Sequence, residues 1–172
     1  MSKRHAISLT LVLSLALAAC GTSDSPSNGV AASSSPSASA KPVVHDGRKV
    51  EISADDTMKY SIVEITAKAG ERLSVTLVNK GNTPKFSMGH NWVLLTLAAN
   101  VDAFLMAAAE AATTDYVPAS KRAEILAATK LLGPGEQDTA TFAAPSAPGR
   151  YPFLCSFPGH AQVGMRGVLI VE

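Results

Sequence analysis

The stretch CSFPGHAQVGM (residues 155–165) spaces Cys155, His160 and Met165 five residues apart. A proline and two glycines within it predict a tight loop and not a helix or strand. Such a loop can turn all three side chains toward one point. Because β-prone runs flank the stretch on both sides, we expect the loop to join two strands.

A second motif, MGHNW (residues 88–92), supplies another histidine at the start of an apolar run. Each residue alone has an ordinary explanation, since a single Cys or Met is usually core packing. Jointly, His90, Cys155, His160 and Met165 predict a metal site. One thiolate, two imidazoles and a weak thioether form a soft, trigonal set that suits copper and electron transfer. The set leaves no open position for a substrate, which argues against an enzyme.

The chain around these motifs is mostly β-prone. The run RLSVTLVN (residues 72–79) alternates apolar and polar residues, as a half-buried strand does. Short strands are predicted over residues 49–53, 60–67, 91–97, 138–143, 150–155 and 166–171. Short strands separated by turn residues are typical of an all-β sandwich. Trp92, the only tryptophan, is expected in its core.

A helical insertion over about residues 101–130 is predicted to interrupt the strands. Residues 101–114 are rich in helix formers, and residues 119–130 are predicted to form a second helix between Pro118 and Gly133. We expect the insertion to cover the sandwich.

The start of the chain predicts export. Residues 1–19 join a basic beginning to an apolar run too short to span a membrane, as signal peptides do. The string LAAC, ending at Cys20, is typical of a bacterial lipoprotein, in which Cys20 is lipidated. Ordinary secretion, with Cys20 discarded, is the alternative. We expect a protein anchored to a membrane and facing the periplasm or the cell exterior.

The remainder divides into a tether and one domain. Residues 20–42 are rich in Ser, Ala and Pro, which predicts a flexible tether. Residues 43–172 have a common length for a single domain. The whole chain has 15 Lys and Arg against 14 Asp and Glu, and 5% aromatic residues. Without a basic field or a stacking platform, nucleic acid is not an expected partner. A monomer is expected.

The motifs MGHNW and CSFPGH together resemble azurin, a type 1 (blue) copper protein of the cupredoxin family. The similarity continues through residues 73–92, residues 115–116 and residues 129–142. It implies a Greek-key sandwich of about eight strands that holds one Cu(I)/Cu(II) ion near one end.

The resemblance also implies roles for single residues. The copper ligands would be His90, Cys155 and His160, with Met165 as axial ligand and the carbonyl of Gly89 as a possible second axial contact. The side chain of Asn91 would link the two ligand loops. The backbone N–H of Phe157 would donate to the Cys155 sulfur and tune the reduction potential.

Three departures from azurin carry consequences. The four residues between His160 and Met165 make a longer spacing, similar to that of auracyanin, plastocyanin and pseudoazurin. The domain has no cysteine for the N-terminal disulfide of azurin, so we expect lower stability. Asn79 occupies the place of a buried azurin histidine that couples protonation to redox potential. We therefore expect a weakly pH-dependent potential.

The resemblance places the edge of His160 inside an apolar docking patch. Its expected members are Met88, Phe157, Pro158, Gly159 and Val163. The expected function is electron transfer between membrane-associated redox proteins, such as cytochromes or membrane oxidoreductases. An extracytoplasmic protein that buffers or delivers copper is the alternative. A fragment of a copper enzyme and a zinc-bound structural domain are less favoured competitors.

Overall fold

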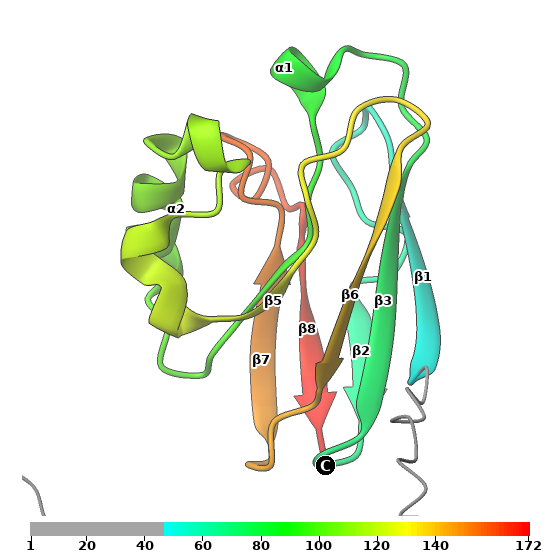
Figure 1. Ribbon diagram of the computed structural model, residues 1–172, viewed down its shortest axis with the longest axis vertical. Helices are drawn as coiled ribbons and strands as arrows, with labels where there is room; N and C mark the ends of the chain where they lie inside the picture. The colour runs from blue at the N-terminus through cyan, green and yellow to red at the C-terminus, as the bar shows by residue number, and fades with distance from the viewer. Residues whose placement is uncertain (1–46) are drawn as a thin grey trace, which may run out of the picture. The chain divides into compact units, whose positions relative to one another are not determined.

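The computed structural model describes residues 47–172, which form two packed β-sheets (Figure 1). The predictions for residues 1–19, for the tether at 20–42 and for Cys20 lie outside the described residues. Within residues 47–172, eight strands are present: β1 (Arg48–Ala54), β2 (Glu64–Ala67), β3 (Arg72–Asn79), β4 (Val93–Leu95), β5 (Ile125–Ala128), β6 (Gln137–Ala143), β7 (Gly149–Leu154) and β8 (Arg166–Val171).

The strand order confirms the predicted sandwich. One sheet has the order β1-β3-β6 and the other has the order β2-β8-β7-β4-β5. β1 runs parallel to β3, and β2 runs parallel to β8, while the other paired strands are antiparallel. Because β1 and β2 follow each other in the chain but lie in different sheets, their connection crosses one end of the sandwich.

The core lies where the alternating patterns predict it. Leu73, Val75 and Leu77 of β3 all have 0% exposure, as does Trp92. The Trp92 ring lies 5.4 Å from that of Phe153, measured between centroids. Two predicted strands are shorter than expected, since β2 begins at residue 64 and β4 spans only residues 93–95.

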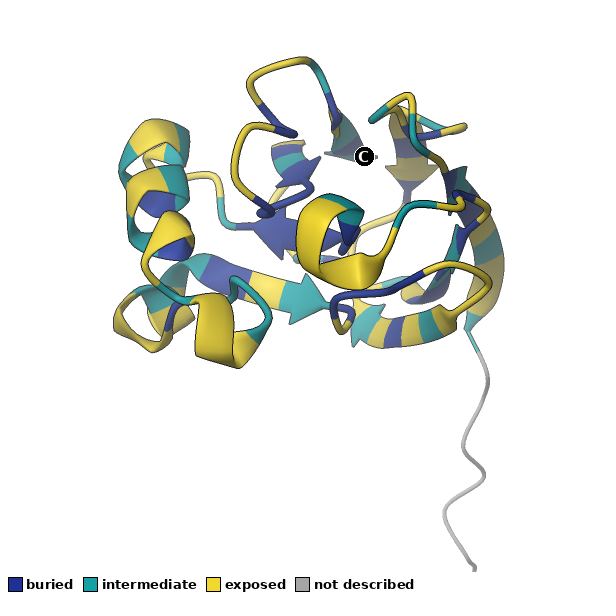
Figure 2. Cartoon of the chain, turned by 90° about the horizontal axis from the view of Figure 1, so that it is seen from above, coloured by how far each residue is buried: buried dark blue, intermediate teal, exposed yellow. Residues whose placement is uncertain are grey.

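The predicted helical insertion is confirmed in its first half. Helix α2 (Val101–Ala109) begins after Asn100, whose side chain accepts a hydrogen bond from the N–H of Ala103 at 3.0 Å. Phe104 and Ala108 of α2 are buried in a second core cluster with residues of β4, β5 and β7. The helix therefore covers the outer face of the five-stranded sheet, as Figure 2 shows by its buried inner side.

The expected helix over residues 119–130 is confirmed only at its start, as 3₁₀ helix, and is wrong from residue 125 onward. The 3₁₀ helix η1 (Ala112–Thr114) precedes a second, irregular 3₁₀ helix, η2 (Ala119–Glu124). Residues 125–128 then form β5, which pairs with β4 at the sheet edge. The alanine-rich sequence favours a helix locally, but pairing with β4 and burial of Ile125 override that preference. No helix within residues 47–172 is long and apolar enough to cross a membrane.

Candidate metal centre

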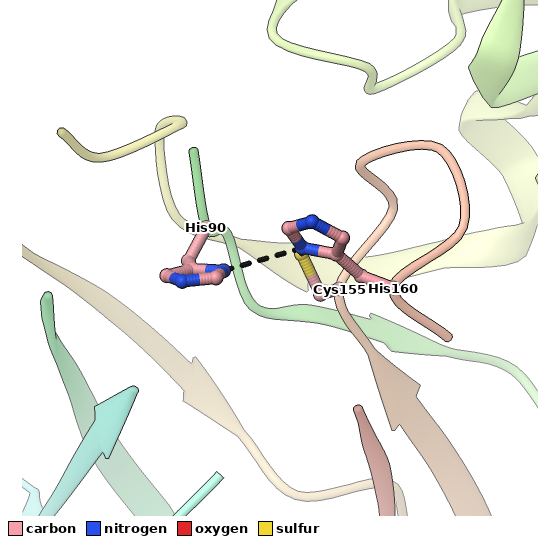
Figure 3. Close-up of side chains that lie close together, drawn as sticks. All are labelled: His90, Cys155 and His160. Atoms are coloured by element: carbon pink, nitrogen blue, oxygen red, sulfur yellow. Dashed lines mark hydrogen bonds between the residues drawn. The ribbon is translucent and has the colours of Figure 1, made fainter. Parts of the chain in front are cut away.

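Three of the predicted ligands converge at the end of the sandwich that carries α1 (Lys85–Met88). His90 follows α1, whereas Cys155 and His160 lie in the connection between β7 and β8. The Nδ1 atoms of the two histidines are 3.3 Å apart, and the Cys155 Sγ lies 3.5 Å from the Nδ1 of His160. All three donor atoms lie within 4.8 Å of one another (Figure 3).

This spacing fits one trigonally coordinated metal ion. Metal–nitrogen distances of about 2.0 Å and a metal–sulfur distance of about 2.3 Å would separate the nitrogens by about 3.5 Å and each nitrogen from the sulfur by about 3.8 Å. The observed separations of 3.3 Å and 3.5 Å are close to these values. His90 and Cys155 have 0% exposure and His160 has 3%. The fold thus forms a buried, soft donor set that suits copper.

Burial keeps the metal-free donors uncharged. It raises the pKa of the Cys155 thiol to about 12. It also lowers the pKa of His160 to about 4, with the charge of His90 as the second cause. The pKa of His90 is lowered by burial as well. At neutral pH both imidazoles therefore offer a lone pair, and a bound cation would compensate the charge of the thiolate.

The backbone around Cys155 favours its ionised form. The N–H groups of Asn91 and Phe157 both act to lower the pKa of the thiol, against the larger effect of burial. For Phe157 the direction agrees with the expected donation to the sulfur, and its effect on the reduction potential stays a prediction. The contribution of Asn91 was not predicted, because it depends on how closely the two ligand loops approach each other.

Met165 and Gly89, the two expected axial contacts, are close to the donors in the core or in the chain, since Met165 packs in the cluster of Cys155 and Gly89 precedes His90. Met165 has 0% exposure and belongs to the same core cluster as Cys155, whose N–H donates to the Met165 carbonyl at 3.1 Å. A side chain at Gly89 would lie 2.6 Å from the carbonyl oxygen of Lys85 and 2.8 Å from the side chain of Leu131. Only glycine fits there without a shift. The coordination of copper by either residue stays a prediction.

Asn91 joins the two ligand loops, as predicted. Its Oδ1 accepts from the N–H of Ser156 at 2.8 Å, and its Nδ2 donates to the Ser156 hydroxyl at 2.8 Å and to the carbonyl of Asp115 at 2.9 Å. Asn91 has 0% exposure and Ser156 has 1%. These bonds fix the residue after His90 against the residue after Cys155.

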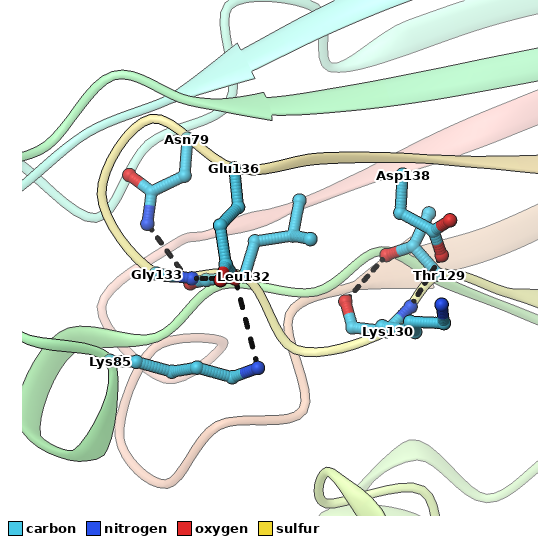
Figure 4. A network of polar contacts seen from close by, with 8 residues as sticks. All are labelled: Asn79, Lys85, Thr129, Lys130, Leu132, Gly133, Glu136 and Asp138. Carbon is cyan, nitrogen blue, oxygen red and sulfur yellow. Dashed lines mark hydrogen bonds and ion pairs between the residues drawn. The ribbon is translucent and has the colours of Figure 1, made fainter.

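Asn79 supports His90 through the backbone (Figure 4). Its Nδ2 donates to the carbonyl of Leu132 at 3.0 Å, and its Oδ1 accepts from the N–H of Gly81 at 2.8 Å. Leu132 in turn exchanges two backbone hydrogen bonds with His90, at 3.1 Å and 2.8 Å. Asn79 is 1% exposed and has no titratable group, so this buried position cannot gain or lose a proton as the pH changes. The weak pH dependence of the potential stays a prediction.

Charged side chains also fix the segment that contains Leu132. Glu136 Oε2 accepts from the N–H of Gly133 at 2.7 Å and lies 3.7 Å from the Lys85 ammonium (Figure 4). The carboxylate of Asp138 accepts from the N–H of Lys130 at 2.9 Å. These contacts hold the segment before β6 against α1 and His90.

The expected docking patch is partly at the surface. Pro158, Gly159 and Val163 are exposed and Met88 is half-buried. Phe157 is 9% exposed, and its ring packs 4.6 Å from His160 and 4.9 Å from Tyr116 between centroids. It thus lies mainly beneath the surface.

Phe86 of α1 is 83% exposed at the same end of the molecule, and sequence reasoning missed it. The sequence did offer an indication, because Phe86 lies two residues before Met88, an expected member of the docking patch.

A β-sandwich with a buried cluster of two histidines and one cysteine at one end defines a type 1 copper protein of the cupredoxin class. Comparison with known proteins agrees. Residues 47–172 match the family model described as "Copper binding proteins, plastocyanin/azurin family". The chain belongs to this family, and copper is its cofactor.

Individual relatives support the same placement. The azurin of Pseudomonas chlororaphis is 36% identical over 128 residues, which cover 72% of this chain and 98% of that protein. The outer membrane protein H.8 of Neisseria gonorrhoeae is 37% identical over 123 residues, which cover 70% of this chain and 66% of that protein. The structure of reduced auracyanin from Roseiflexus castenholzii superposes with a TM-score of 0.65 and 37% identity, covering 74% of this chain and 98% of that one.

Proposed function

We propose that this chain is a mobile electron carrier that holds one electron at a time on copper bound by His90, Cys155, His160 and Met165. The observation that carries the proposal is the buried donor set, whose three donor atoms lie within 4.8 Å of one another. A site held in this form by the fold changes little when the metal changes oxidation state, which favours rapid electron transfer. Copper supplies the reversible one-electron redox chemistry.

The fold supports a carrier more than an enzyme. The donors are buried, and their number fills the strong positions of a trigonal site without a place for substrate. The His160 ring instead packs 4.6 Å from that of Phe157, which precedes the exposed Pro158 and Gly159 in the chain.

The docking surface of the carrier is the apolar end of the molecule around these donors. Val163 is 50% exposed and Phe86 is 83% exposed there, and Pro158 and Gly159 lie beside His160 in the chain. Small apolar contacts give short-lived complexes, as turnover between redox partners requires. Partners of this kind are cytochromes or membrane oxidoreductases. Val163→Asp should slow electron self-exchange and leave the copper spectrum unchanged, whereas an unchanged exchange rate would contradict this surface.

Copper buffering or delivery is the second candidate. It would use the same donors, but exchange of copper is slow from a site whose thiolate and imidazoles are buried. Slow loss of copper to a chelator supports the carrier. Rapid loss supports delivery.

We also propose that Cys20 carries a lipid that anchors the domain to a membrane outside the cytoplasm. The support is the LAAC string and the name of a relative, an outer membrane protein. In the full chain, Cys20→Ser should move the protein from the membrane to the soluble fraction. Membrane association that survives this change would refute the anchor.

Visible and EPR spectra of the Cu(II)-loaded protein test the carrier directly. We expect an intense thiolate-to-copper band with narrow hyperfine splitting, bleached by a mild reductant. Cys155→Ser should abolish the band, while Cys20→Ser, the matched change at the only other cysteine, should leave it intact. A pale complex in the unaltered chain would overturn the electron-carrier proposal.

A further inference from the structure

The connection from β1 to β2 forms an ordered turn at the end of the sandwich that holds the metal centre. The N–H of Thr57 donates to the Asp55 carboxylate at 3.0 Å, and the N–H of Met58 donates to the Asp55 carbonyl at 3.0 Å. Met58 has a φ of 55°, a left-handed conformation that a residue other than glycine seldom adopts. The backbone of Tyr60 then forms a bridge with Ala54. These contacts give the turn a defined shape.

Two side chains of this turn reach the segment that carries His90. The Asp56 carboxylate accepts from the N–H of Asn82 at 3.0 Å and from that of Thr83 at 3.3 Å, just before α1. The buried hydroxyl of Tyr60 donates to the carbonyl of Asn91 at 2.5 Å. The turn therefore contacts the chain on both sides of His90.

A third side chain reaches the other ligand loop. The Lys59 ammonium donates to the carbonyl of Val163, within the four residues that separate His160 from Met165. Its Nζ lies so close to Gly164 that an added Cβ there would be 2.8 Å away. Within the described residues, Lys59 is the only side chain that donates a hydrogen bond to a backbone carbonyl of residues 161–164.

The loop between His160 and Met165 consists of turns, without a helix or strand. Its internal hydrogen bonds are Val163 N–H to the Gly159 carbonyl at 3.2 Å, Gly164 N–H to the Ala161 carbonyl at 3.1 Å and Met165 N–H to the His160 carbonyl at 2.9 Å. Gly164 has a φ of 101°, so the loop turns sharply just before Met165. A thioether is a weak, long axial ligand. The loop, more than the bond to the metal, must then set the position of the sulfur.

We propose that Lys59 is a positioning residue that holds the His160–Met165 loop and thereby fixes the axial methionine. The inference rests on the proposed function as far as Met165 is an axial ligand. The ammonium acts without touching the metal, through the Val163 carbonyl. Asp56 and Tyr60 fix the same turn to the His90 segment, so one connection spans both ligand loops.

Lys59→Met tests the contact because it keeps the aliphatic stem and removes the donor and its charge. In the metal-free protein, we expect hydrogen exchange at the amides of Val163, Gly164 and Met165 to become about tenfold faster. In the Cu(II) protein, the intensity ratio of the thiolate-to-copper bands and the EPR rhombicity should shift. Lys59→Arg, which retains a charged donor, should restore both.

Lys68→Met is the matched control, since Lys68 is an exposed lysine in the turn between β2 and β3 at the opposite end of the sandwich. It should change neither measurement. Unchanged exchange in metal-free Lys59→Met would overturn the role of Lys59, and so would a change that Lys59→Arg does not restore. Absence of a thiolate band in the unaltered chain would instead count against the electron carrier, while the metal-free exchange would still decide whether Lys59 holds the loop.

Discussion

Replacing Asn91 with alanine should destabilise the metal-free protein by about 3 kcal/mol. The side chain makes three hydrogen bonds, two with Ser156 and one with the carbonyl of Asp115, at 2.8 to 2.9 Å. Each such bond contributes about 1 kcal/mol. Because Ser156 is 1% exposed, water cannot readily replace the lost partner, which keeps the cost near the full sum.

Urea unfolding followed by the fluorescence of Trp92, the only tryptophan, measures this loss. Asn82→Ala is the matched control, since Asn82 is exposed and only its backbone N–H takes part in the contact with Asp56. It should change stability by less than about 0.5 kcal/mol. Adding Ser156→Ala to Asn91→Ala should cost less than the two single changes combined. A loss below about 1 kcal/mol for Asn91→Ala would refute the bridging role.

Three further outcomes follow from burial and packing. The pKa of His160 is lowered to about 4, so the folded state takes up its proton less readily than the unfolded chain. The stability from this residue is fully present above about pH 6.5 and is lost progressively as the pH falls from about 6.5 to about 4. Between pH 7.5 and 4.5, the free energy of unfolding of the metal-free protein should fall by about 2 to 3 kcal/mol more than that of His160→Gln, as measured by urea titration. Equal losses in the two proteins would contradict this prediction. Phe104→Ala should cost about 3 to 5 kcal/mol by leaving a cavity under α2, while the copper spectrum stays unchanged; a shifted spectrum would mean that α2 supports the site. Because Asn79 cannot titrate, the reduction potential should stay nearly constant from pH 6 to 8 in voltammetry, and a large shift would refute this.

The sequence predicts best what short-range patterns determine. The alternation in residues 72–79 defined β3, and the two motifs named the donors that the fold brings together. Residues 125–128 were missed because their local composition favours a helix, while the decisive contact is the pairing with β4. Local pattern cannot show that a neighbouring edge is available for pairing.

Contacts between distant segments were the other gap. Lys59 and Val163 are 104 residues apart, and Tyr60 and Asn91 are 31 apart. No spacing rule relates such residues. Phe157 was expected in the docking patch because of the resemblance to azurin, yet its ring packs against those of His160 and Tyr116. An aromatic residue next to a buried metal ligand can pack against that ligand inside the protein and need not be exposed.

The separation of the donors along the chain has a consequence for protein turnover in the cell. His90 and His160 lie 70 residues apart, and Cys155 is the only cysteine of residues 47–172, so no disulfide joins two described residues. A metal bound by both histidines closes that loop, a constraint equivalent to about 4 kcal/mol of chain entropy for a permanent cross-link. Because metal binds the folded form, stability rises with the logarithm of its free concentration. When copper is scarce, the chain should open more often and be cleaved sooner by proteases, so that copper supply sets how long each molecule survives.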